Sequence, residues 1–190
     1  MKVEVINYQD NWQAVKDAAM RTIGSDSGKY PSDAWKRKIL LAEHSPIRLI
    51  DLTVSIKGIP YYSVMHLVRH KIGIEHWVST QRTDRTGVNR NELRQDALVD
   101  YTFRANAQAF ITISRKRLCT QADKTTRDVW KAVIEAISEV EPVLASVCHP
   151  DCCYRGFCPE MRSCGYIDSG IGQMELQCYR HGVAMMVKSS

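Results

Sequence analysis

Hydrophobic and polar positions alternate with a period of two over residues 50–57, where apolar Ile, Leu and Val are interleaved with Asp, Thr, Ser and Lys. This period predicts a half-buried strand. Gly58 is expected to turn the chain after the strand, and Pro60 suits the first turn of a helix that ends near residue 69. The buried face of that helix would carry Val64, Leu67 and Val68.

A period near 3.6 predicts helices in four other places. These are residues 11–22, residues 33–43 with Ser32 as the N-cap, residues 104–118, and a long helix opened by a capping box at Thr120-Gln-Ala-Asp123. The buried side of the long helix would carry Trp130, Val133, Ile134, Ile137 and Leu144. Residues 24–30 and 80–92 lack periodicity and are expected to be loops. The expected fold class is α+β, or mixed α/β, with helices packed on a small sheet.

Length and composition fit one compact subunit. A chain of 190 residues with 44% hydrophobic residues forms a single domain, or one domain with a small appendage. No run of about 18 apolar residues occurs, so no membrane span is expected. The N-terminal MKVEVINYQD lacks an apolar signal segment, which favours a cytoplasmic protein. Seven cysteines in such a chain indicate free thiols or metal ligands rather than disulfides.

Positive charge is concentrated in the middle of the chain. The net charge is +5, and residues 69–117 contain ten Lys and Arg against five Asp and Glu. An excess placed in this way indicates anionic ligands, and both nucleotides and nucleic acid qualify.

The most distinctive motif is Arg69-His70-Lys71, followed by seven residues and then Ser79. Consecutive cations are costly to bury unless each has a partner, and a phosphate or an anionic cofactor supplies one. A solvated basic loop is the other interpretation of the same residues. Ser79 alone is weak evidence, because serines near loops are commonly turn or cap residues.

The motif resembles the Arg-His-Arg, seven residues, Ser signature of the flavin-dependent thymidylate synthases. Other segments resemble that family in the same order: Ala18-Ala19-Met20-Arg21, His44-Ser45-Pro46, residues 52–59, and Asn106-Ala107-Gln108 with Arg117 eleven residues after the asparagine. The resemblance therefore extends over most of residues 1–147, which we expect to form one family-like domain.

The resemblance implies reductive methylation of deoxyuridylate (dUMP) to thymidylate (dTMP), with methylenetetrahydrofolate as the carbon donor, FAD carrying hydride and NADPH supplying electrons. It also implies a homotetramer whose sites lie between subunits. Flavin contacts are implied for Ser45, Arg69, His70, Lys71 and Asn106. Ser79 would lie at the reactive pyrimidine ring as the catalytic residue, and nucleotide contacts are implied for His66, Ser79, Arg82, Arg94 and Arg117.

Several positions depart from the family pattern. Lys71 replaces an arginine, which keeps the charge and loses the planar fork, and His66 stands where a glutamine is usual. His76 and Trp77 replace polar and acidic residues between the triplet and the serine, and Gln108 replaces an arginine expected near the flavin. The residues implied to bind the nucleotide therefore match the family pattern better than those implied to bind the flavin. A 5-hydroxymethyl pyrimidine nucleotide is an alternative product.

Residues 148–190 form a Cys-rich C-terminal tail. Cys148, Cys152, Cys153, Cys158 and Cys164 fall close together, with His149 among them and Cys178 beyond. Their spacings are near those of zinc sites, but the segment contains no pair of Cys-x2-Cys motifs. Bound zinc and reduced structural thiols are therefore both possible interpretations. A different class of function is a nucleic-acid-binding protein with a zinc-ribbon-like tail, or a catalytically altered nucleotide-binding homologue. Against nucleic acid, the aromatic residues Tyr101, Phe103 and Phe110 are expected on helix faces rather than exposed among the basic residues.

Overall fold

A computed structural model describes residues 1–182 of the chain. Its contacts divide the chain into two compact units, of which the first contains residues 1–31 and 44–109 and the second contains residues 32–43 and those from 110 onward. The last part of the expected Cys-rich tail, residues 183–190, lies outside the described residues. The boundary expected after residue 147 stays a prediction.

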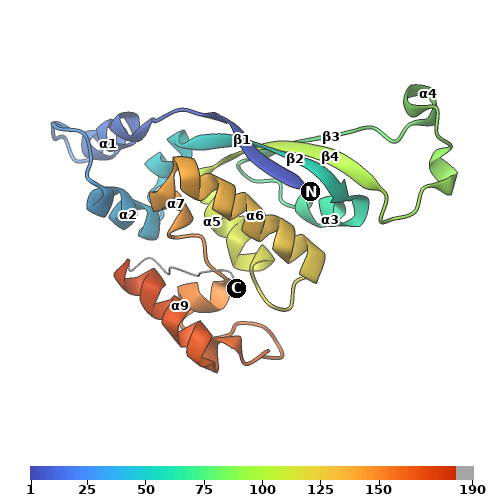
Figure 1. The fold of residues 1–190 in the computed structure, drawn as a ribbon. Helices are drawn as coiled ribbons and strands as arrows, with labels where there is room; N and C mark the ends of the chain where they lie inside the picture. The colour runs from blue at the N-terminus through green and yellow to red at the C-terminus, as the bar shows by residue number, and fades with distance from the viewer. Residues whose placement is uncertain (183–190) are drawn as a thin grey trace. The chain divides into compact units, whose positions relative to one another are not determined.

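The first unit is built on a four-stranded antiparallel sheet with the order β1-β2-β4-β3 (Figure 1). Its strands are β1 (Lys2–Tyr8), β2 (Asp51–Pro60), β3 (Ile74–Val78) and β4 (Leu98–Asn106). Alternate side chains of β2 and β4 are buried, which confirms the strand predicted from the period of two over residues 50–57. The buried set includes Val54, Ile56, Val99, Tyr101, Phe103 and Ala105.

Two boundaries predicted around this sheet are wrong. The helix expected over 104–118 begins later, because residues 104–106 complete β4 and α5 runs from Ala107 to Arg117. Tyr101 and Phe103 therefore lie on a strand rather than on a helix face, although they are as buried as Phe110 and cannot stack on nucleic-acid bases. Gly58 does not end β2, because the strand passes through a bulge between Ile56 and Ile59 and continues to Pro60.

Helices complete the first unit. They are α1 (Trp12–Arg21), the 3-10 helix η1 (Ser45–Leu49), α3 (Tyr61–Leu67), α4 (Thr83–Thr86) and η2 (Arg90–Glu92). α1 packs against η1, while α3 packs against β2 and β4. The segment between β3 and β4, which carries α4, extends away from the sheet (Figure 1). The expected loop at 80–92 is thus irregular apart from two short helical turns.

The second unit is helical. It contains α2 (Asp33–Leu41), the larger part of α5, α6 (Lys124–Val140), α7 (Pro142–Ala145), α8 (Asp151–Arg155), η3 (Tyr166–Asp168) and α9 (Gly170–His181). Ser32 caps α2 as predicted, since its hydroxyl accepts a hydrogen bond from the Trp35 amide at 3.3 Å. At the centre, the Trp130 indole donates to the Ser114 hydroxyl at 2.9 Å.

Two details of the predicted long helix are wrong. Its N-cap is Asp123 rather than Thr120, because the Asp123 carboxylate accepts from the Thr126 amide at 2.8 Å. Leu144 belongs to α7, since α6 ends at Val140 before Pro142, which cannot continue the helical hydrogen bonding.

Together the sheet and the helices confirm the α+β class. Among the described residues, no helix has both the length and the apolar composition required to cross a bilayer.

Candidate functional site

An open, polar cavity of about 490 Å³ lies at one end of the sheet in the first unit. It gathers residues from η1, from the start of β2, from the approach to β3 and from the end of β4. Lys71 and Asn106, predicted from separate sequence segments, both line it. The full lining is Arg48, Asp51, Lys71, Gly73, Ile74, Glu75, Arg104, Ala105 and Asn106.

Asn106 is held in place at the junction of β4 and α5. Its side-chain Oδ1 accepts a hydrogen bond from the backbone amide of Ala109 at 3.0 Å, and its backbone amide donates to the Gly73 carbonyl at 2.9 Å. Gly73 has φ +71°, and a Cβ atom there would lie 2.6 Å from Asn106 Nδ2. A glycine is therefore required for β3 and Asn106 to approach each other at the cavity wall.

The basic triplet is anchored through its backbone. The His76 ring lies 2.7 Å from the His70 carbonyl through Nε2 and 2.6 Å from the Tyr101 hydroxyl through Nδ1. A neutral ring with its proton on Nε2 donates to the carbonyl and accepts from the tyrosine. Burial raises the pKa of Tyr101, which keeps that donor protonated. The Arg69 and Lys71 side chains are exposed beside this anchor.

Two of the cavity's cations, Arg48 and Arg104, were not among the predicted site residues. Arg104 makes a two-pronged ion pair with Asp51, with N–O distances of 2.8 and 2.9 Å. Hydrogen bonding to Asp51 raises the pKa of Arg104, so the guanidinium stays charged. The alternation of buried and exposed residues along β4 was the signal that could have placed Arg104 on the exposed face.

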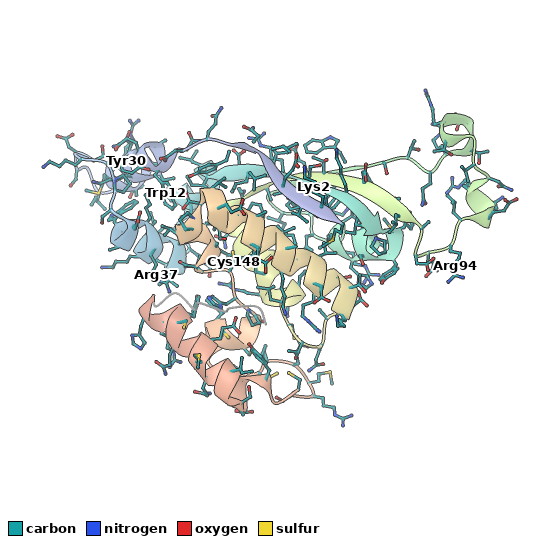
Figure 2. All side chains as sticks on the ribbon, in the orientation of Figure 1. Lys2, Trp12, Tyr30, Arg37, Arg94 and Cys148 are labelled. Atoms are coloured by element: carbon teal, nitrogen blue, oxygen red, sulfur yellow. The ribbon has the colours of Figure 1, made fainter. Side chains whose placement is uncertain are left out.

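Ser79, Arg82 and Arg94 lie outside the lining of this cavity. Ser79 follows β3, where its amide donates to the Asp100 carbonyl at 2.8 Å and its Oγ accepts from the Asp100 amide at 2.9 Å. Arg82 pairs with Asp84 at 2.7 Å, and Arg94 pairs with Asp96 at 3.0 Å. Figure 2 shows Arg94 on the extension between β3 and β4. All three side chains are exposed.

The remaining predicted residues are spread over three helices. Ser45 opens η1, the same short helix that brings Arg48 to the cavity, and its side chain is exposed. His66 lies in α3, with its ring 6.4 Å from that of Tyr62. Arg117 is the last residue of α5 and belongs to the second unit.

Solved structures share this architecture. Flavin-dependent thymidylate synthase ThyX from Helicobacter pylori, in a complex with FAD and dUMP, aligns with a TM-score of 0.63 at 14% identity, over 78% of this chain and 100% of that chain. A second ThyX structure from the same organism, also with FAD and dUMP, aligns with a TM-score of 0.62 at 14% identity, over 78% of this chain and 99% of that chain. The chain has the fold of the flavin-dependent thymidylate synthases.

The thymidylate synthase fold is also shared with a nucleotide methylase. The UMP/dUMP methylase PolB from Streptomyces cacaoi, bound with 5-Br dUMP, aligns with a TM-score of 0.60 at 15% identity, over 76% of this chain and 92% of that chain. No family model and no curated sequence matches the chain. The likeness is thus one of three-dimensional structure.

A compact polar cluster lies in the second unit. His149 Nδ1 is 2.7 Å from Glu175 Oε1, and the Tyr166 hydroxyl donates to the other carboxylate oxygen of Glu175. Potential metal-ligand atoms of His149, Cys153 and Glu175 all lie within 4.8 Å of one another. Burial acts to raise the pKa of Glu175, but hydrogen bonds from His149 and Tyr166 outweigh it and hold that pKa below 4.5. The carboxylate is therefore already satisfied within the protein.

Proposed function

We propose that this protein transfers a one-carbon group from methylenetetrahydrofolate to C5 of a pyrimidine deoxynucleotide, with FAD as redox cofactor and NADPH as reductant. The observation that carries the proposal is the meeting of Lys71 and Asn106 at one cation-lined cavity in a chain with this fold. The relatives in this fold were crystallised with FAD, dUMP or 5-Br dUMP.

The cavity's donor set fits the diphosphate of FAD. Arg48 and Lys71 offer cationic donors and Asn106 offers an amide, while Arg104 is paired with Asp51, and Glu75 is the second carboxylate of the wall. Guanidinium and ammonium groups pair with phosphate oxygens through charge-assisted hydrogen bonds. Arg69, His70 and Ser45 are proposed to extend this contact from the flanking segments. When bound, FAD supplies hydride chemistry that amino-acid side chains lack.

Ser79 is proposed to hold the pyrimidine ring. Its oxygen accepts a hydrogen bond from the Asp100 amide, which fixes the side chain and leaves the hydroxyl proton to be donated to a ring carbonyl. Positioning of this kind lowers the barrier when the contact is stronger in the transition state than in the ground state.

In the first unit, Arg82 and Arg94 are proposed to contact the nucleotide phosphate, with His66 near the nucleotide. In the second unit, Arg117 is proposed as a phosphate contact in its own right. Arg82 and Arg94 each pair with an aspartate two residues away, at exposed positions. Exposed ion pairs contribute little stability, so a doubly charged phosphate can replace Asp84 or Asp96 at low cost.

The direct test is to incubate the purified chain with dUMP, methylenetetrahydrofolate, FAD and NADPH and to identify the product by mass. Thymidylate is the expected product, and a 5-hydroxymethyl nucleotide, which contains one more oxygen atom, is the variant. Lys71→Ala should abolish turnover, whereas Lys57→Ala, an exposed lysine of β2 outside the cavity, should keep it. Nucleotide binding without any product would instead indicate a catalytically altered homologue.

A further inference from the structure

Four cysteines line one small cavity in the second unit. Cys119 lies two residues after the end of α5, Cys152 lies in α8, and Cys158 and Cys164 lie on the segment between α8 and η3. All four are free thiols in the structure. Cys119 stands far from the others in sequence and was not part of the expected Cys-rich tail, so only the fold brings the four together.

Several contacts fasten these segments around the cavity. The Thr120 hydroxyl donates to Cys164 Sγ at 2.8 Å, and the Gln121 side-chain amide donates to the Arg162 carbonyl. The backbone of Gln121 hydrogen-bonds to the Cys119 sulfur, and that of Tyr166 to the Cys164 sulfur. Cys158 packs against Cys152 in a small apolar cluster with Ile167. The sulfur atoms are therefore held in an arranged, partly shielded site.

We propose that Cys119, Cys152, Cys158 and Cys164 ligate a four-iron, four-sulfide (4Fe–4S) cluster. Four cysteine thiolates are the ligand set of such clusters, and hydrogen bonds to the sulfur atoms together with burial tune them. This site is separate from the cavity at the end of the sheet, and the proposal does not depend on one-carbon transfer.

The spacing of the sulfur atoms distinguishes this cluster from zinc. Zinc bound to four sulfurs at about 2.3 Å brings those sulfurs within about 3.8 Å of one another. Across residues 1–182, however, only His149, Cys153 and Glu175 form a group of three ligand atoms within 4.8 Å, so the four cavity cysteines are spread more widely.

The surroundings suit a negatively charged cluster that joins distant segments. Lys116 lies 3.5 Å from Asp151 and 3.6 Å from Glu160, and Arg155 lies 3.1 Å from Asp151, so two cations offset the charge of these two lining carboxylates. A cluster ligated by Cys119 and by the three later cysteines would connect the end of α5 to the segment from α8 to η3. Its loss would therefore weaken the second unit as a whole.

The test is to purify the full chain without oxygen from iron-supplied cells and to measure iron, acid-labile sulfide and zinc. We expect about four iron and four sulfide per chain. Sulfide analysis is unaffected by any flavin colour. Cys164→Ser should lose the iron and sulfide. Because Cys164 is exposed, a serine there costs little packing and the variant should remain folded.

The matched control is Cys178→Ser, which removes a thiol of α9 from the same unit but not from this cavity. It should retain the full iron and sulfide content. Removing iron from the unaltered protein with a chelator should lower its melting temperature but leave that of Cys164→Ser unchanged. One zinc per chain in place of iron, absence of any metal, or equal iron loss in both variants would overturn the proposal.

Discussion

Ser79 extends the hydrogen-bonding ladder between β3 and β4 with its side chain. Its Oγ accepts from the Asp100 amide, so the hydroxyl points from a fixed place rather than from a mobile loop. We expect Ser79→Ala to reduce turnover far more than nucleotide affinity, because the proposed contact to the pyrimidine strengthens in the transition state. Steady-state kinetics together with calorimetric titration of dUMP separate the two effects.

Ser32→Ala provides the control for Ser79. Ser32 is also exposed, and its hydroxyl likewise accepts from a backbone amide, that of Trp35 at 3.3 Å, but no part of the proposed site includes it. Each variant loses one such bond, worth about 0.5–1.5 kcal/mol of stability. Equal reductions in turnover for the two variants would remove Ser79 from the proposed chemistry.

Arg117, a proposed phosphate contact, is held by a regular helix, α5. Arg117→Ala should weaken binding of a deoxynucleotide by about 1.5–3 kcal/mol, the range for a hydrogen bond to a charged group. Calorimetric titration measures the affinity, and Arg180→Ala, an exposed arginine near the end of α9, serves as the control. Unchanged affinity in Arg117→Ala would exclude this side chain from the nucleotide site.

At the scale of elements, the approach to β3 is fixed by a glycine. Gly73→Ala would bring a Cβ to 2.6 Å from Asn106 Nδ2, so the asparagine must move and release its cap on α5. We expect this variant to lose FAD affinity and to be destabilised by about 1.5–4 kcal/mol, which combines backbone strain at positive φ with the loss of a helix cap. Fluorescence quenching of FAD and thermal melting measure the two effects.

Gly87→Ala is matched to Gly73→Ala in backbone conformation. Gly87 has φ +72°, yet no atom outside its chain neighbours lies within 4 Å of its added Cβ. Gly87→Ala should therefore lose only the stability that corresponds to backbone strain, about 1–2 kcal/mol, and should retain FAD affinity. If both glycine variants bind FAD equally well, the position of Asn106 does not govern the cofactor site.

The elements differ in how far the sequence could predict them. α2 and β2 were predicted because each has a cap or a clear period of its own. β4 was misassigned near its end because it passes into α5 through Ala105-Asn106-Ala107, with no glycine or proline to mark the boundary. β3 escaped prediction because it is a five-residue edge strand whose pattern includes Glu75 and His76.

The site shows the same division between local and long-range information. Lys71 and Asn106 could be predicted because their motifs are continuous in sequence. Arg104 could not, because its place at the cavity depends on strand pairing: Asp51 lies opposite Asn106, and Glu75 lies opposite Arg104. Arg48 could not either, because it reaches the cavity from η1, ahead of β2. Strand pairings join residues far apart in the chain, and periodicity within one segment carries no information about them.

At the scale of the whole molecule, the first unit leaves a strand edge and apolar side chains uncovered. β3 is an edge strand, and Trp77 on it is 51% exposed. Edge strands with exposed apolar side chains favour pairing with another chain. We therefore expect the protein to assemble as a homotetramer, as the resemblance implies, with this edge at a subunit interface.

Multi-angle light scattering tests that assembly directly. The unaltered protein should have four times the mass of the chain, about 87 kDa given 21.7 kDa per chain and closed symmetry. Trp77→Glu should shift the mass toward smaller species, because burying a carboxylate at the interface is costly. Ile23→Glu, at a 69% exposed position after α1, should leave the mass unchanged. A monomeric mass for the unaltered protein at all concentrations, with full turnover, would show that a single chain completes the site.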